Sequence, residues 1–307
     1  MFEAFQIGQA IIWMRLLFLL IAIWLSSEFF FRLTEAANLS LQDFKLKARW
    51  YPLSFFLVGR LVAILGTYQT YLKHPQRIFI FWDGEFSFLG GAIGIALVIF
   101  WITRSHRTTF LQWLDVLLPA TTFGLIFDWI GMFAAAQSYG KPTNLPWGVT
   151  VNTFSVRYAV PIHPVQLYYA LFFIVLTFSL LLIRRYSKRA GAETLFGIVI
   201  ASCATFLLEF LRGDTAIPVF AKLTDLLFLA SLFISLGILA ALPSALTRKG
   251  NMVYGASVAS LTIVYIALRA WIPVIGFQLR FSQLTAILAL LATIVYVVVH
   301  RRKYPHL

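Results

Sequence analysis

Residues 165–183 read VQLYYALFFIVLTFSLLLI and contain no charged side chain. A helix needs about 20 mostly apolar residues to cross the roughly 30 Å hydrocarbon core of a membrane. The stretch has that length and composition. It also lacks the period-two alternation of polar and apolar residues that is typical of strands in membrane β-barrels. We therefore expect a membrane-spanning α-helix here.

Similar apolar runs occur along the whole chain. Sixty per cent of the residues are hydrophobic and 12% are charged, whereas soluble domains have about a quarter charged residues. So much apolar surface must face lipid. We predict an all-α, polytopic integral membrane protein with about nine spans. The expected spans are 11–31, 51–71, 86–103, 113–136, 165–183, 191–211, 223–246, 252–272 and 282–300.

The basic residues between the spans predict the orientation of the chain. With the N-terminus outside, about twice as many Lys and Arg residues lie on the inner side as on the outer side, as the positive-inside rule requires. We therefore expect the N-terminus outside and the C-terminus inside. The first run lacks a preceding basic segment and a small-residue cleavage site, so we expect it to remain as a helix.

The same rule explains the net charge of +13. No basic stripe alternates with exposed aromatic residues, so nucleic acid is not an expected partner. Cys203 is the single cysteine of the chain, which excludes an intrachain disulfide and a cysteine-based metal cluster. We expect neither a metal nor a cofactor.

Charged residues inside the expected spans are the first candidates for function, because a charge at membrane depth is costly and usually faces a cavity or a partner. An arginine there suits a lipid phosphate, which a guanidinium can bind through two parallel hydrogen bonds. The orientation places four of these residues in the outer half of the bilayer, with His163 nearby. The candidates are Arg15, Arg60, Asp115, Asp128, Glu209 and Arg212.

Each candidate also has a purely structural interpretation. Glu209 and Arg212 are three residues apart on one helical face, which fits mutual neutralisation. The side chain of Arg15 is long enough to reach the outer interface. Asp115 fits a partner for a loop or a helix end, and His163 fits a cap at the start of a helix. Gly90 and Gly94 have the GxxxG spacing that lets two helices pack closely.

The longest connection, from Gln137 to Ile162, falls on the outer side and carries three prolines and Trp147. We expect an ordered loop at the membrane interface. Phe81-Trp82-Asp83-Gly84 predicts a turn at the same interface.

Several segments occur in an order that is typical of one family. They are Gly59-Arg60; Phe81-Trp82-Asp83-Gly84 followed by Ser87-Phe88-Leu89-Gly90-Gly91; Asp115 with Pro119; Tyr139 to Gly148; His163-Pro164-Val165-Gln166-Leu167-Tyr168; and Glu209-Phe210-Leu211-Arg212. Together they resemble prolipoprotein diacylglyceryl transferase, a bacterial inner-membrane enzyme. The resemblance covers residues 1–246 and implies a seven-span core, with 247–307 as an additional C-terminal transmembrane hairpin.

The resemblance implies a reaction at the outer face of the inner membrane. The thiol of a lipobox cysteine in a preprolipoprotein attacks phosphatidylglycerol, or another anionic phospholipid, and receives the diacylglyceryl group. Residues in catalytic positions are expected to be Arg212, Arg15 and Glu209. Residues expected to contact the lipid are Arg60, His163, Gln166, Tyr168, Trp147, Gln137 and Gly140.

The chain also departs from the family pattern, mostly at polar positions. The departures are Trp129 for an arginine, Met132 and Ala135 for asparagines, Gln137 and Tyr169 for glutamates, Leu89 for a histidine and Arg15 for a tyrosine. Arg15 is a candidate to supply the positive charge that Trp129 lacks. Two alternatives stay open: an inactive relative that binds phospholipid or lipoprotein precursors, and a transporter or a lipid-modifying enzyme with another substrate.

Overall fold

The computed structural model describes residues 4–7, 10–40, 45, 47–66, 68–79, 86–104, 107–151, 160–187, 189–213, 221–241, 248–269, 271 and 278–303. The chain forms two compact units, Met1–Pro218 and Val219–Leu307. The turn expected at Phe81-Trp82-Asp83-Gly84 and residues 152–159 of the long loop lie outside the described residues.

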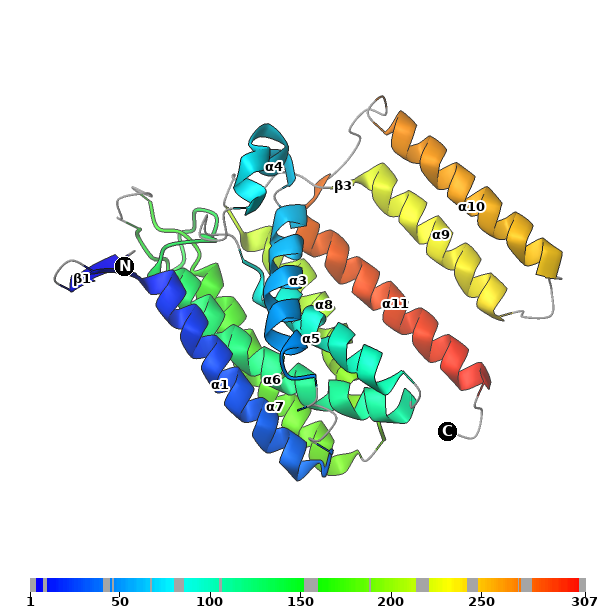
Figure 1. The fold of residues 1–307 in the computed structure, drawn as a ribbon. Helices are drawn as coiled ribbons and strands as arrows, with labels where there is room; N and C mark the ends of the chain where they lie inside the picture. Colours follow the sequence, from blue (N-terminus) through cyan, green and yellow to red (C-terminus); the bar gives the residue numbers. More distant parts are fainter. Residues whose placement is uncertain are drawn as a thin grey trace. The chain divides into compact units, whose positions relative to one another are not determined.

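The first unit is a bundle of α-helices in which α6 is central (Figure 1). α6 packs against α1, α5 and α7, while α3 packs against α5 and α8 packs against α7. A hairpin of β1 (Ala4–Ile7) and β2 (Ala10–Trp13) precedes the bundle. The bundle helices are α1 (Met14–Ala36), α3 (Trp50–Gly66), α4 (Tyr68–Lys73), α5 (Phe88–Thr103), α6 (Arg107–Ala134), α7 (Val165–Tyr186) and α8 (Ala192–Leu208), with 3₁₀ turns η1 (Pro75–Phe79) and η2 (Glu209–Leu211).

The second unit contains α9 (Leu223–Ala241), α10 (Arg248–Leu268) and α11 (Phe281–Lys303). Short strands β3 (Ala221–Lys222) and β4 (Gln278–Leu279) pair antiparallel beside them. Asp225 at the start of α9 accepts hydrogen bonds of 2.9 and 2.8 Å from Arg269, and one of 2.7 Å from the Tyr265 hydroxyl. This pairing of a buried carboxylate ties the first turn of α9 to the end of α10.

The described helices confirm the predicted class, an all-α polytopic membrane protein. Five are long and apolar enough to cross a membrane, namely Met14–Ala36, Thr109–Ala134, Val165–Tyr186, Ala192–Leu211 and Phe281–Val298. Four shorter apolar helices are Trp50–Gly66, Phe88–Thr103, Thr224–Leu236 and Met252–Leu268. Each expected span therefore contains one apolar helix. The number of spans, their orientation and the boundary at residue 246 stay predictions.

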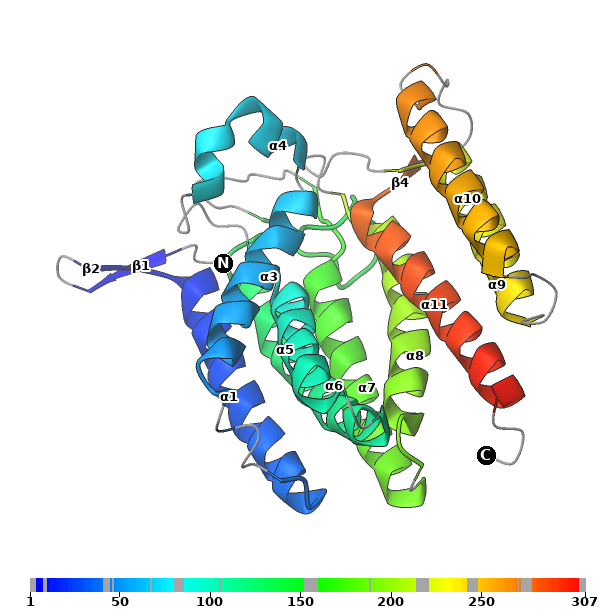
Figure 2. The same cartoon turned by 45° about the vertical axis from the view of Figure 1, so that its right-hand side comes forward.

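The GxxxG spacing on α5 has the packing role expected of it (Figure 2). α3 and α5 lie side by side, and the Ser54 hydroxyl of α3 donates a 2.8 Å hydrogen bond to the Gly94 carbonyl of α5. A Cβ atom at Gly94 would collide with the Ser54 carbonyl, and one at Gly90 would meet Val62. Glycine is required here because the two backbones approach so closely.

The contacts of Asp115 confirm its predicted role as a partner for a helix end. Its carboxylate accepts hydrogen bonds from the backbone N–H groups of Gly191 and Thr194, at 2.5 and 2.9 Å, and from the Thr194 hydroxyl at 2.7 Å. These donors belong to the start of α8, whose first N–H groups have no partner within the helix. Arg184 adds a 2.9 Å ion pair with Glu193 beside them. Asp115 therefore fastens α6 to the start of α8.

Replacing Asp115 with alanine is expected to lower the free energy of unfolding by about 2–4 kcal/mol, because buried donors at Gly191 and Thr194 lose their acceptor. The thermal midpoint in detergent would measure the loss. Thr194→Val is the control, since it removes one donor and leaves both backbone N–H groups paired with Asp115. An unchanged midpoint for Asp115→Ala would contradict the capping role.

Candidate functional site

The long loop folds over the end of the bundle where α6 ends and α7 begins. The Lys141 N–H donates a 2.8 Å hydrogen bond to the Leu211 carbonyl, and the His163 N–H donates one of 2.9 Å to the Lys141 carbonyl. Gly140 lies in this crossing, where a Cβ atom would collide with the His163 carbonyl. The described part of the loop is therefore ordered by contacts with η2 and the start of α7. Gly140 has a packing role here, and contact with lipid stays a prediction for it.

Arg212 lies at the end of η2 and forms an ion pair with Glu209. The Arg212 Nη1 atom is 2.9 Å from Glu209 Oε1, and the exposed fractions of the two side chains are 10% and 1%. The 3₁₀ turn favours this contact because residues i and i+3 eclipse one another in it. The structure therefore contains the mutual pairing that the three-residue spacing allowed.

The pair is extended by hydrogen bonds from two other segments. The Tyr169 hydroxyl of α7 donates to Glu209 Oε2 at 3.1 Å, and Arg212 Nη2 donates to the Ser138 hydroxyl of the loop at 3.4 Å. Ser138 has a positive φ of 54°, which is uncommon for a residue other than glycine. One connected polar cluster thus joins α7, η2 and the loop.

The Tyr169 ring connects this polar cluster with α6. It stacks on Trp129, with ring centroids 4.0 Å apart and an angle of 8° between the planes. Both residues are predicted departures from the family pattern, Trp129 at an arginine position and Tyr169 at a glutamate position. These two residues, 40 positions apart in the chain, meet in one aromatic contact.

Arg15 forms a second ion pair at the start of α1. Its Nη1 atom contacts Asp128 Oδ1 of α6 and donates a 3.1 Å hydrogen bond to the Asp128 carbonyl. The Arg15 side chain is 15% exposed and the Asp128 side chain 3% exposed. The Arg15 side chain therefore packs against α6.

Five of the other residues predicted to contact lipid form two hydrogen-bonded groups. The Trp147 indole N–H donates a 2.7 Å hydrogen bond to the Tyr168 hydroxyl, which lies 3.2 Å from His163 Nδ1. The buried Gln166 side chain donates to the Gln137 carbonyl at 2.5 Å. Trp147 is exposed, so the first group forms an aromatic rim of the kind found at membrane interfaces.

Arg60 belongs to a different set of contacts. It is buried on α3, donates a 2.9 Å hydrogen bond to the Arg77 carbonyl and lies 5.3 Å from the centroid of the Tyr71 ring. These contacts connect α3 with α4 and η1. The contact of Arg60 with lipid stays a prediction.

The sequence did not predict the contacts of Asp128 and Tyr169 or the presence of Ser138 in the site. Asp128 was a candidate, but its pairing with Arg15 could not be read from residues 113 positions apart. Tyr169 stood out as a departure from a family pattern, and its hydrogen bond to Glu209 was not predicted. Ser138 carried no signal in the sequence.

The chain was compared with known proteins. Residues 3–243 match the family model described as prolipoprotein diacylglyceryl transferase. Three similar proteins are named phosphatidylglycerol–prolipoprotein diacylglyceryl transferase. One, from Pseudomonas fluorescens strain Pf-5, is 34% identical over 54% of this chain and 63% of its own length. One from Polynucleobacter necessarius is 33% identical over 48% and 55%. One from Pseudomonas fluorescens strain SBW25 is 30% identical over 66% and 72%. The chain thus spans less than two thirds of the first two relatives.

Proposed function

Because this chain belongs to the prolipoprotein diacylglyceryl transferase family, we propose that it transfers diacylglyceryl from phosphatidylglycerol to the lipobox cysteine of a preprolipoprotein. The thiolate sulfur attacks the glycerol carbon, a C–S bond forms, and the C–O bond to glycerol phosphate breaks. The reaction takes place at the outer face of the bacterial inner membrane. The observation that carries the proposal is the family match over residues 3–243, which includes every predicted site residue.

Within this proposal, Arg212 stabilises the phosphate of the leaving group. A guanidinium in a site shielded from water stabilises developing negative charge strongly. In the described structure Glu209 already neutralises Arg212, so the phosphate must compete with that carboxylate or join it. Glu209 and Tyr169 then keep the guanidinium in place until the lipid binds, and Arg15 supplies a second positive charge from α1.

The proposal includes the architecture predicted from the sequence. The N-terminus lies outside and the C-terminus inside, residues 1–246 form the transferase-like core, and residues 247–307 add a hairpin. This orientation places the start of α1, the end of α6 and the long loop on the outer side. The Arg212 cluster then lies in the leaflet where phosphatidylglycerol and the preprolipoprotein meet.

A second candidate function is a relative that binds phospholipid or a lipoprotein precursor without transferring lipid. The stack of Trp129 on Tyr169 favours it, since an uncharged contact occupies positions where the family carries an arginine and a glutamate. Losing one such charge contact costs about 10²–10³ in rate. The same cluster, with Arg212 paired to Glu209, would still hold a lipid headgroup.

Complementation separates these two functions. The chain would be expressed in bacteria depleted of their own transferase, and lipoprotein mobility on gels would report diacylglyceryl transfer. Mature lipoprotein is the expected result. Purified protein, phosphatidylglycerol and a lipobox peptide would provide the direct assay. Stable expression without transfer in both experiments would refute the transferase proposal and leave the binding function.

The stack of Trp129 on Tyr169 gives a prediction about stability. Tyr169→Glu is expected to destabilise the protein by about 2–4 kcal/mol, because a second buried carboxylate would lie beside Glu209. Adding Trp129→Arg should recover about 1–3 kcal/mol by supplying the opposite charge. Thermal midpoints of both single variants and the double variant complete the cycle. Tyr169→Phe is the control, since it keeps the ring. Additive effects of the two substitutions would contradict the prediction.

A further inference from the structure

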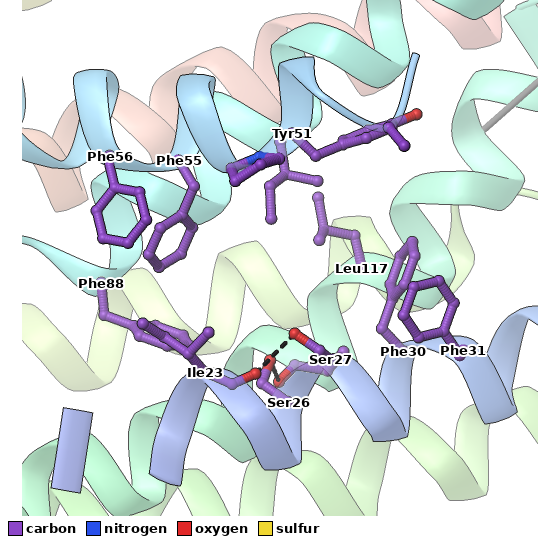
Figure 3. A pocket seen from close by; sticks show the side chains of 14 residues that line it. Ile23, Ser26, Ser27, Phe30, Phe31, Tyr51, Phe55, Phe56, Phe88 and Leu117 are labelled. Carbon is purple, nitrogen blue, oxygen red and sulfur yellow. Dashed lines mark hydrogen bonds between the residues drawn. The ribbon is translucent and has the colours of Figure 1, made fainter. Parts of the chain in front are cut away.

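An apolar pocket of about 320 Å³ lies between α1, α3, α5 and α6. Figure 3 shows Phe55 and Phe56 of α3 facing Ile23 and Ser27 of α1 across it. Leu117 of α6 closes one side. None of the residues predicted to bind the donor lipid lines this pocket.

The lining offers little hydrogen bonding to an occupant. The Ser26 hydroxyl donates a 2.8 Å hydrogen bond to the Ala120 carbonyl, and the Ser27 hydroxyl donates one of 2.7 Å to the Ile23 carbonyl. Both serine hydroxyls therefore already use their protons on the backbone. Most of the other lining residues are aliphatic or aromatic. The pocket suits an occupant without polar groups.

The volume of the pocket suits a small apolar group or a chain segment. A cavity of about 150 Å³ holds benzene, and the pocket has about twice that volume. A flexible hydrocarbon chain can bend into such a space. In a membrane-spanning protein, the surrounding medium supplies acyl chains.

The depth of the pocket favours one leaflet. At 1.5 Å per residue, Ile23 and Phe31 lie about 12 and 24 Å along α1 from Arg15. Half of the hydrocarbon core measures about 15 Å, so most of the pocket lies beyond the bilayer centre as counted from Arg15. Residues Tyr51 to Phe56 of α3 lie in the first two turns of that helix. An acyl chain would thus enter from the leaflet at the C-terminal end of α1.

Cations border the pocket at that end. Ala48 lines the pocket and lies between Lys47 and Arg49 in the chain, while Phe31 lines it and precedes Arg32. Arg32 pairs with Glu28 at 2.8 Å, both of them exposed, and such a pair contributes little and can exchange partners. Glu35 is also exposed on α1, so the excess of positive charge lies on the α3 side, at Lys47 and Arg49.

Two tryptophans accompany these cations. The Lys47 ammonium lies 4.6 Å from the centroid of the Trp101 ring, and Trp50 packs edge-on against Trp101. Both rings are partly exposed, at 38% and 45%. Tryptophan with lysine or arginine is typical of the level at which lipid headgroups lie. An aromatic and basic surface therefore borders the pocket at Ala48.

We propose that this pocket binds one acyl chain of an anionic phospholipid from the leaflet at the C-terminal end of α1, with its phosphate at Lys47 and Arg49. This site lies near the opposite end of α1 from Arg15. It is thus separate from the donor-lipid site of the proposed function and does not depend on transferase activity. Burial of methylene groups and attraction to two cations both contribute to the affinity.

Photolabelling tests the acyl-chain part of the proposal. The full-length protein in nanodiscs would receive phosphatidylglycerol with a diazirine on one acyl chain, and labelled peptides would be identified by mass spectrometry. Labels are expected to concentrate in residues 23–31 and 48–56. Ser27→Trp should fill the mouth of the pocket and remove most of that labelling. Ser179→Trp is the control, since Ser179 is half-buried on α7 and its hydroxyl also bonds to the carbonyl four residues earlier.

Headgroup selection tests the second part. Lys47→Gln combined with Arg49→Gln is expected to lower labelling at this site about tenfold or more, since each cation near the surface attracts anionic lipid. Phosphatidylethanolamine, which has no net charge, would carry the same diazirine as a second probe. It should label the wild type as weakly as the phosphatidylglycerol probe labels the variant with both glutamines. Arg185→Gln combined with Arg189→Gln removes two other exposed cations and should change nothing.

Three outcomes would overturn the proposal: labels spread evenly over the lipid-facing helices, equal labelling of Ser27→Trp and Ser179→Trp, or equal labelling by the two headgroups. Arg212→Gln separates this site from the proposed function. Labelling of residues 23–31 and 48–56 should persist in that variant even if diacylglyceryl transfer is lost. Loss of the label in Arg212→Gln would mean that a single lipid occupies both regions.

Discussion

Arg212→Gln is expected to lower the rate of diacylglyceryl transfer by about 10²–10³. The guanidinium is the cation of the cluster that joins η2, α7 and the long loop, and a neutral amide cannot stabilise the phosphate charge to the same extent. Initial rates with purified protein, phosphatidylglycerol and a lipobox peptide would give the ratio. Arg212→Lys keeps the charge but not the planar fork, so it should retain part of the activity.

A loss of activity in Arg212→Gln could also come from the unpaired Glu209, which is 1% exposed. The variant Glu209→Gln with Arg212→Gln removes both charges and with them this burial cost. If Arg212 serves the phosphate, the double variant regains thermal stability and remains inactive. If it regains both stability and transfer, the pair is structural and Arg212 has no role in the reaction.

The parts of the fold that lipid imposes could be predicted from the sequence. Each of the nine expected spans contains an apolar helix, because a chain in hydrocarbon must satisfy its backbone hydrogen bonds within continuous apolar segments. The close contact at Gly94 and the structural role of Asp115 followed from local patterns as well. The hairpin of β1 and β2 and the short helix α4 were not predicted. The expected first span began within β2, and the expected second span ended within α4.

The pairings that build the site were harder to predict, and distance along the chain explains why. Glu209 and Arg212 are neighbours on one turn, so their spacing indicated the contact. Arg15 and Asp128 belong to different helices, and Tyr169 meets Glu209 only where α7 and η2 come together. Charge within the expected spans identified the four charged participants, but not Tyr169. Only the packing of α1, α6 and α7 determines which of them meet.

The pair of Arg15 and Asp128 is expected to show the largest effect on stability. Arg15→Gln leaves the Asp128 carboxylate, 3% exposed, without its counter-charge. Breaking a buried ion pair on one side costs about 3–5 kcal/mol. Chemical or thermal unfolding in detergent would measure the change. Arg32→Gln is the control, because Arg32 lies on the same helix in an exposed pair and should change stability by less than about 1 kcal/mol.

A double variant of the same pair tests whether Arg15 replaces the positive charge that Trp129 lacks. Arg15→Gln with Asp128→Asn removes both charges and should recover most of the stability, because neither partner is left alone. Under the proposed function this stable variant transfers little or no diacylglyceryl, since the start of α1 no longer supplies the second cation that the proposal assigns to Arg15. Full transfer by the double variant would show that Arg15 and Asp128 only join α1 to α6, and that the phosphate relies on Arg212 without help from Arg15.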